Sequence, residues 1–185
     1  MKLSSKKKKS PDILRQSLTI RPAEPADAGR VAEIHIDSWE AAYAEILPES
    51  AIAKASTRRP AMWLEKLSAE MDDETIYLAV LDGETVGFSG LGKCRDEDVP
   101  PETGEIRGFY LHPDYWRRGI GSRLLKYSLE ELKKRSFRKV VLWVLENNTP
   151  ARKFYERNGL SFDGTRKQIV IGNPVAEVRY SMELC

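Results

Sequence analysis

Residues 104–159 carry the pattern that most limits how this chain can fold. Glu105–Leu111 has the composition of a strand, and Arg123–Lys134 has leucines at the spacing of an amphipathic helix. Lys139–Leu145 is a nearly continuous apolar run, which is typical of a strand buried on both faces. Pro150–Asn158 follows with a proline in its first turn, as a short helix often does. These residues predict two strands that alternate with two helices.

The flanking segments extend this series into a mixed sheet. For the last helix we expect Thr149 as the N-cap and Gly159 after the end. The other expected elements are a strand at Leu18–Arg21, a helix from Asp27, helical stretches from Pro48 and over Pro60–Ala69, a hairpin of Thr75–Leu81 and Val86–Gly92 around Asp82-Gly83, and a half-buried strand over Val178–Leu184. Hairpins combined with strand–helix–strand units predict an α/β fold of mixed, α+β character, with helices on both faces of one sheet.

The charge is unevenly distributed along the chain. Five lysines and no acid lie within residues 1–10, so residues 11–185 carry a net charge of −3 although the whole chain carries +2. We expect residues 1–17 to be a disordered basic tail and residues 18–185 to be one folded domain. The alternative for the lysines is an arm that binds nucleic acid or anionic lipid. The mildly acidic body favours neither partner.

No apolar run approaches the length needed to span a membrane, and no secretory signal follows the N-terminal lysines. Cys94 and Cys185 lie far apart and lack metal-ligand spacing. We therefore expect a cytoplasmic protein without a metal.

A turn rich in arginine and glycine joins the first strand to its helix. The unpaired N–H groups at a helix N-terminus favour anions, and glycines let the backbone approach a phosphate closely. Neither a Walker ending nor a complete dinucleotide fingerprint is present, because Gly119 and Gly121 are followed by Leu124. The alternative is a strand-to-helix turn without a ligand.

Three motifs together resemble the GCN5-related N-acetyltransferase superfamily, and within it the small bacterial and archaeal acetyltransferases. They are SWEAAYAEILP at Ser38–Pro48, FYLHPDYWRRGIGSRLL at Phe109–Leu125 and LWVLENNTPARKFYERNGL at Leu142–Leu160. The superfamily's pyrophosphate pattern is Gln/Arg-x-x-Gly-x-Gly/Ala. Here Trp116 holds its first position, which removes one polar contact and leaves the backbone unaffected.

The resemblance implies an N-acetyltransferase domain that uses acetyl-CoA, with its two central strands splayed around the pantetheine arm. It implies that Tyr155 is the general acid and that Asn148 lies near the pantetheine. The remaining implied cofactor positions are Phe109, Tyr110 and Leu111 for the pantetheine and Arg117, Arg118, Gly119, Ile120, Gly121 and Ser122 for the pyrophosphate.

Acyl transfer from a thioester requires a neutral amine, a stabilised oxyanion and a protonated leaving thiolate. Glu105 is the candidate base: alternation puts it on one strand face with Arg107, Phe109 and Leu111, and it matches the catalytic glutamate of some histone acetyltransferases in the superfamily. The alternatives for Glu105 are an exposed glutamate or a structural ion pair. Glu146 is a rival base.

Trp39 and Tyr43 are candidates for the acceptor pocket because they lie at i and i+4 of the first helix. Core packing is the alternative for both. An acidic loop at Asp96–Asp98 is a further candidate for attracting an amine, and His35 and His112 are expected to be packing or surface residues.

The expected acceptor is the primary amine of a small molecule. The alternatives are a protein or peptide N-terminal amine, or a module that binds acyl-CoA without turnover. A homodimer through the C-terminal strands is a further expectation.

Overall fold

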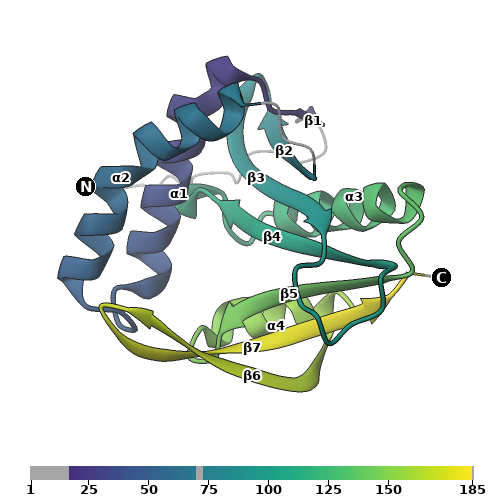
Figure 1. Ribbon diagram of the computed structural model, residues 1–185. Helices are drawn as coiled ribbons and strands as arrows, with labels where there is room; N and C mark the ends of the chain where they lie inside the picture. The colour runs from purple at the N-terminus through teal and green to yellow at the C-terminus, as the bar shows by residue number, and fades with distance from the viewer. Residues whose placement is uncertain (1–16, 70–72, 185) are drawn as a thin grey trace, which may run out of the picture.

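The computed structural model describes residues 17–69 and 73–184, and their strands form one seven-stranded sheet (Figure 1). The strand order is β1-β2-β3-β4-β5-β7-β6, and within these residues only β4 and β5 run parallel. The strands are β1 (Leu18–Pro22), β2 (Glu74–Leu81), β3 (Glu84–Lys93), β4 (Thr103–Leu111), β5 (Lys139–Leu145), β6 (Ser161–Ile171) and β7 (Asn173–Glu183). The helices are α1 (Ala28–Tyr43), α2 (Glu49–Ser68), α3 (Ile120–Lys134) and α4 (Thr149–Arg157), with short 3-10 turns η2 (Pro25–Asp27) and η3 (Pro113–Tyr115).

The helices lie on opposite faces of the sheet, as the predicted fold class requires. Neighbouring residues of β2 show this division, because side chains alternate between faces along a strand. Leu78 packs in one cluster with Val31 of α1 and Trp63 of α2. Ala79 packs in another with Leu124 of α3. Figure 1 shows α1 and α2 together on one side, and α3 and α4 on the other. The fold-class prediction is confirmed.

The basic tail expected over residues 1–17 lies outside the described residues, apart from Ser17. The Ser17 N–H donates to the Asp82 carboxylate at 2.9 Å, so this residue already contacts the β2–β3 turn. In that turn Asp82 and Gly83 both have positive φ, at 51° and 87°, which is the backbone of a tight hairpin. The predicted hairpin is confirmed. None of the helices within the described ranges has the length and apolar character needed to cross a membrane.

Two element predictions were wrong, and one strand was missed. The two helical stretches expected from Pro48 and over Pro60–Ala69 are one continuous helix, α2, with Pro60 inside it. The helix tolerates the proline because a buried stripe that includes Trp63 holds it against α1 and the sheet. The N-cap of α4 is Asn148 rather than Thr149, since the Asn148 side chain accepts from the Ala151 N–H at 3.2 Å. Strand β6 was not expected, because most of its residues are exposed and show no apolar alternation.

A β-bulge in β4 overturns the predicted alternation along this strand. Gly90 of β3 pairs with Gly108 and Leu91 pairs with Ile106, so Arg107 has no partner of its own. Ile106 and Phe109 consequently both pack with the cluster beneath α3 and α4. Glu105 therefore lies on the opposite face of the sheet from Phe109 and Leu111, not on the same face.

Candidate active site

The central feature of the site is the separation of β4 from β5. The two strands pair only from Thr103 to Glu105, opposite Lys139 to Val141, although β4 continues to Leu111 and β5 to Leu145. Beyond Glu105, β4 pairs on one side only, with β3. Figure 1 shows the two strands diverging toward their C-terminal ends. The splay that the resemblance implied is present, and it leaves one edge of β4 open to an extended ligand.

The open end of β4 leads into the uncapped N-terminus of α3. Gly119 is the N-cap of α3 with φ of 78°, and no side chain within the described residues caps the helix. The first intrahelical bond at this end is from Arg123 N–H to the Gly119 carbonyl, so the preceding N–H groups of the first turn are not used by the helix. Arg117, with φ of 59°, and Arg118 are exposed beside this turn. The arrangement suits a phosphate group.

Trp116 fixes this turn through its indole ring. Its Nε1–H donates to the Leu111 carbonyl at 2.6 Å. The tryptophan that replaces the superfamily's Gln/Arg thus anchors the turn to the end of β4. Ile120 is buried under the turn, while Ser122 is exposed on its outer side.

A groove runs along α3 toward the end of α4. Its volume is about 470 Å³, and its walls include Arg123, Lys126 and Asn158. It begins beside Ser122 in the first turn of α3. Lys126 pairs with Glu130, which also lines the groove, at 3.9 Å, so Arg123 is the cation of the lining without a carboxylate partner among the described residues.

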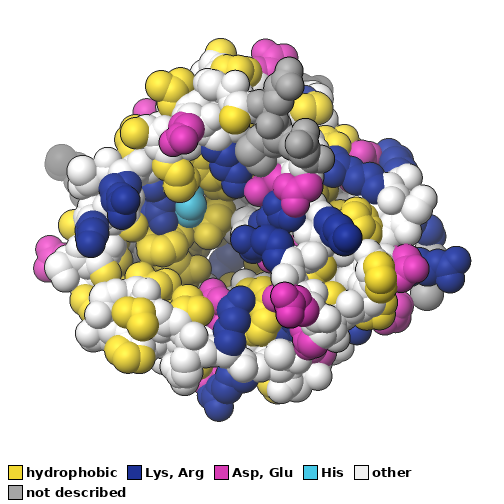
Figure 2. All heavy atoms as spheres, in the orientation of Figure 1, with side chains coloured by type: hydrophobic (Ala, Val, Ile, Leu, Met, Phe, Trp, Pro, Cys, Tyr) yellow, Lys and Arg dark blue, Asp and Glu magenta, His cyan; other side chains and the backbone are white. Residues whose placement is uncertain are grey.

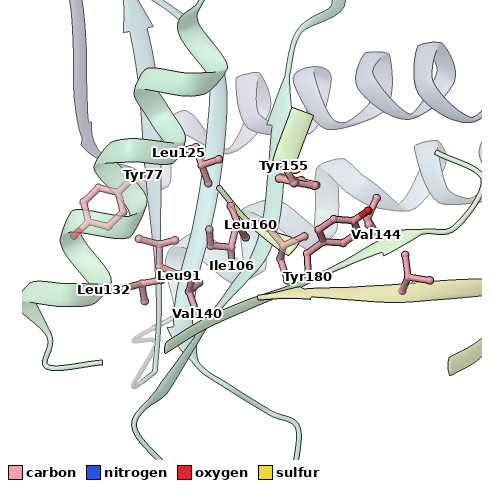
Figure 3. Close-up of a cluster of buried hydrophobic side chains, with 12 residues drawn as sticks. Tyr77, Leu91, Ile106, Leu125, Leu132, Val140, Val144, Tyr155, Leu160 and Tyr180 are labelled. Carbon is pink, nitrogen blue, oxygen red and sulfur yellow. The ribbon is translucent and has the colours of Figure 1, made fainter. Parts of the chain in front are cut away.

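Tyr155 projects from α4 into the cluster between the sheet and the helices (Figure 3). Its ring makes an edge contact with Phe109 of β4, with 6.3 Å between the ring centroids. Its hydroxyl makes no hydrogen bond with a residue that the structure describes. Burial, followed by the nearby Tyr110, raises the pKa of Tyr155 above its ordinary value. The phenol therefore keeps its proton at neutral pH and is available as a donor.

Aromatic side chains line the opposite side of the splay, where α1 and α2 face β4. The Trp39 and Tyr43 rings pack edge to face with centroids 5.1 Å apart. The Trp39 Nε1–H donates to the Tyr110 hydroxyl at 3.4 Å, and the Asn148 side chain lies beside Tyr43. Figure 2 shows a hollow in this region with largely hydrophobic walls and Lys or Arg side chains around it. The structure thus brings Trp39, Tyr43 and Asn148 together.

Glu105 is buried, with 2% of its surface exposed, and is paired with arginine. Arg95 donates to both of its carboxylate oxygens, at 2.6 and 2.9 Å, and Arg107 Nε lies 3.8 Å away. The Arg95 side chain is 63% exposed, so it covers the carboxylate from the solvent side. The structural ion pair, one of the two alternatives for Glu105, is therefore present. A catalytic role additionally requires Arg95 to move away from the carboxylate.

The other acidic candidates are occupied by arginines. Glu146 pairs with Arg166 at the surface. Asp96 and Asp98 both bind Arg179, at 3.0 and 2.7 Å. Asp163 binds the same guanidinium at 2.7 Å, so one buried cation is shared by three carboxylates. The two loop carboxylates are held on Arg179 and do not point freely toward an amine.

The two histidines differ in environment. His112 begins the 3-10 turn after β4, where its Nδ1 accepts from the Asp114 N–H at 3.3 Å and its Nε2 lies 3.1 Å from Asp37. His35 lies inside the aromatic group, with its ring centroid 4.2 Å from that of Tyr110. Across residues 17–69 and 73–184, no group of three or more His, Cys, Asp or Glu side chains is arranged to hold a metal ion.

Sequence reasoning missed Arg59 of α2. Arg59 is 4% exposed and lies with its guanidinium carbon 4.0 Å from the centroid of the Trp39 ring. The signal that was available is its spacing: Ile52, Arg59 and Trp63 lie seven and four residues apart, which places the arginine on the apolar stripe of α2.

The splayed strands, the uncapped N-terminus of α3 and the buried tyrosine suit an extended, phosphate-bearing ligand. Residues 31–160 match the acetyltransferase (GNAT) family, and the chain belongs to that family. It is an N-acetyltransferase.

Relatives from bacteria and archaea agree with this assignment. A probable N-acetyltransferase of Mycobacterium tuberculosis is 27% identical over 151 residues, which cover 80% of this chain and 82% of that protein. A spermidine N(1)-acetyltransferase of Thermoplasma acidophilum is 25% identical over 153 residues, covering 80% and 91%. The structure of the PaiA N-acetyltransferase from T. acidophilum in complex with coenzyme A shares the fold, with a TM-score of 0.74 and 22% identity, and covers 90% of this chain and 99% of that one.

Proposed function

We propose that this enzyme transfers an acetyl group from acetyl-CoA to the primary amine of a small molecule. The observation that carries the proposal is the separation of β4 from β5 after Glu105, with Tyr155 beside it. An extended arm with amide groups can add to the open edge of β4 as a further strand would. The coenzyme A bound to the PaiA protein supports the choice of donor.

The donor is held along a continuous path. The pantetheine arm lies along Phe109, Tyr110 and Leu111 with Asn148 nearby, and the pyrophosphate meets the N–H groups at the start of α3. The groove that contains Arg123 and Lys126 takes the remaining phosphate and the nucleoside. The backbone turn that binds the pyrophosphate comprises Arg117, Arg118, Gly119, Ile120, Gly121 and Ser122.

In the reaction, the amine nitrogen attacks the thioester carbon and forms a tetrahedral intermediate. A backbone N–H on the open edge of β4 stabilises the oxyanion. The carbon–sulfur bond then breaks while the departing sulfur receives the Tyr155 proton. The nitrogen loses its surplus proton, which restores that of Tyr155 and leaves a neutral amide. Burial keeps Tyr155 protonated until the thiolate forms, but it also makes the phenol a weaker acid, so its assistance should lie near the low end for general acid catalysis.

The attacking amine must first lose a proton, and Glu105 is our proposed base. Its carboxylate is buried while its partner Arg95 is largely exposed, so an incoming ammonium can replace the arginine without exposing the carboxylate to water. The proton then passes from the amine to Glu105. Substituting Glu105 and Arg95 separately distinguishes a catalytic base from a structural ion pair.

A contact beside the aromatic residues favours a small acceptor over a peptide. The turn between β6 and β7 meets the start of α2, where a Cβ on Gly172 would lie 2.9 Å from Ala51 and 3.2 Å from Pro48. Leu47, Ile52 and Leu145 form a hydrophobic cluster at this junction. Trp39 and Tyr43 pack against the same cluster, so the contact restricts the space for an elongated chain on their side.

The proposal is tested by a thiol-release assay with acetyl-CoA and a panel of small amines and peptides with free N-termini. We expect CoA and N-acetylated small amine in equal amounts. Acetylation restricted to the peptides would contradict the small-molecule assignment, and binding of acetyl-CoA without any amide product would contradict transfer itself.

A further inference from the structure

Arg59 is a buried cation without an anion. No hydrogen bond or ion pair joins its guanidinium to any residue in the described ranges, and its Nη1 is fully buried without an acceptor. Its contact is with the face of the Trp39 ring, at 4.0 Å. Burial lowers the pKa of the guanidinium by more than the nearby Tyr110, Tyr43 and Glu40 raise it. Arg58, the preceding residue, is exposed.

His35 adds a second unused donor beside the same indole ring. The Trp63 Nε1–H donates to His35 Nδ1 at 3.1 Å, so in the neutral ring the proton is on Nε2. That Nε2 is buried and has no partner within the described residues. Burial, then the charges of Arg59 and Lys66, lowers the pKa of His35 to about 2, so the ring is neutral at physiological pH.

Ser56 supplies a third buried polar group without a partner within the described ranges. It precedes Arg59 by three residues on α2, which puts both on one side of the helix. Its Oγ is likewise buried without a hydrogen-bond partner in the described part of the chain. A guanidinium, an imidazole N–H and a hydroxyl thus lie on the neighbouring helices α1 and α2, with no carboxylate of the described residues hydrogen-bonded to any of them.

We propose that Arg59, with His35 and Ser56, binds the carboxylate of the acceptor, so that the substrate is an amino acid or a related amine bearing a carboxylate. This inference rests on the proposed acetyl transfer. A guanidinium matches a carboxylate in shape and charge, and neutral N–H and O–H donors complete the shell of an anion. An unpaired buried charge is costly to the folded protein, and a bound carboxylate offsets that cost.

The location suits such an acceptor. Trp39 contacts Arg59 through its ring and Tyr110 through its Nε1–H, so it separates the anion site from β4 by the width of one indole. A carboxylate held at Arg59 therefore directs the rest of the molecule toward the splay, where the acetyl group arrives. A polyamine, the substrate named for the spermidine acetyltransferase relative, would bring positive charge toward this buried arginine.

Matched substrate pairs test the inference. Amino acids, including 4-aminobutyrate, are each compared with the corresponding carboxamide or decarboxylated amine in the acetyl-CoA assay. We expect kcat/KM for the best carboxylate to exceed that of its uncharged partner by about 10- to 100-fold, the usual effect of a charge-assisted hydrogen bond. Equal rates within pairs, or a preference for polyamines, would overturn the inference while leaving acetyl transfer intact.

Arg59→Met and Arg59→Lys test whether the preference for a carboxylate depends on the Arg59 side chain. Arg58→Met, at the exposed neighbouring position, is the control. Arg59→Met should raise KM for the carboxylate by about 10- to 100-fold more than it raises KM for the carboxamide. Arg59→Lys, which keeps the charge, should restore part of the loss. Arg58→Met should behave as wild type. Retention of the carboxylate preference in Arg59→Met contradicts the inference.

Stability gives a readout independent of turnover. Without substrate, Arg59→Met should have a higher Tm than wild type, because the substitution removes a buried charge that has no partner. The N-acetylated product of the best carboxylate should raise the Tm of wild type and not of Arg59→Met. A lower Tm for ligand-free Arg59→Met would mean that Arg59 is a structural residue. Failure of acetyl transfer with every amine, with a normal carboxylate-dependent Tm rise, would instead refute the proposed function alone.

Discussion

The side chains that we propose for the donor and for the acceptor lie on opposite sides of the splay. Tyr155 and Phe109 lie on the side of α3 and α4, whereas Trp39 and Arg59 lie on the side of α1 and α2. The placement of Trp39 beside Tyr43 could be predicted from helical spacing alone. Arg59 was missed although its spacing puts it on the apolar stripe of α2, because a charged residue on a helix is ordinarily solvent-exposed.

Tyr155→Phe should lower kcat by about 100-fold, near the low end for general acid catalysis. The ring remains, so the Tm and the affinity for acetyl-CoA should hold. Because the pKa of Tyr155 is raised, wild-type kcat should show no loss from its ionisation below about pH 10. Steady-state kinetics across pH provide the measurement. Full kcat in the variant would remove the hydroxyl from the mechanism.

Glu105→Gln and Arg95→Gln distinguish a base from an ion pair. If Glu105 accepts the proton, its variant should lose at least about 10-fold in kcat at neutral pH, with the loss shrinking as pH rises and free amine becomes abundant. Arg95→Gln should keep most of kcat, because its loss leaves the carboxylate free. Equal kcat and equal loss of Tm in the two variants would identify a structural pair.

His35 should make the fold sensitive to acid. Its pKa is about 2 in the folded protein and near 6.5 in the unfolded chain, so below pH 6.5 the unfolded chain binds a proton that the folded protein does not. The free energy of unfolding should fall as pH decreases from 6.5, by up to about 1.4 kcal/mol per pH unit. Denaturant melts of His35→Gln should show a shallower slope, with His112→Gln as the control. An unchanged slope in His35→Gln would contradict the burial of a neutral ring.

Helices and strands with a strong local sequence pattern were predictable. Features that depend on how strands pair with one another were not. The apolar run of β5 and the leucine spacing of α3 identify those elements without tertiary information. The bulge at Arg107 depends on how β4 pairs with β3, so alternation along one strand cannot reveal it. Strand β6 lacks a buried face and forms because β7 pairs with it.

The first turn of α3 should be the element that binds phosphate. A Cβ at Gly121 would lie 3.4 Å from the Phe154 ring and 4.0 Å from Phe109, so valine would extend methyl groups across the entry to the splay. At acetyl-CoA 100-fold above its dissociation constant, wild type should gain about 2.7 kcal/mol. Gly121→Val should lose most of the resulting Tm shift. Gly29→Val, with no atom within 4 Å of its Cβ position, should keep it. A full shift in Gly121→Val would contradict the assignment of this turn.

For the whole molecule, the sheet behaves as two parts that meet at a short junction. Strands β1 to β4 form one part and β5 to β7 the other, and they pair across Thr103 to Glu105. The divergence of the two parts separates the proposed donor path, on the side of α3 and α4, from the proposed acceptor site, on the side of α1 and α2. The family motifs made this architecture predictable; the closure between Gly172 and Pro48 was not, because it joins segments far apart in the chain.

Mapping acetyl-CoA binding by backbone amide NMR tests the central claim most directly. Titration should shift the amides of residues 106–111 on the open edge of β4 and of residues 119–122 at the start of α3. The strands β1 and β6, at the outer edges of the sheet, should change little. Saturable shifts confined to residues outside the splay, or no shifts at all, would contradict an active site between β4 and β5.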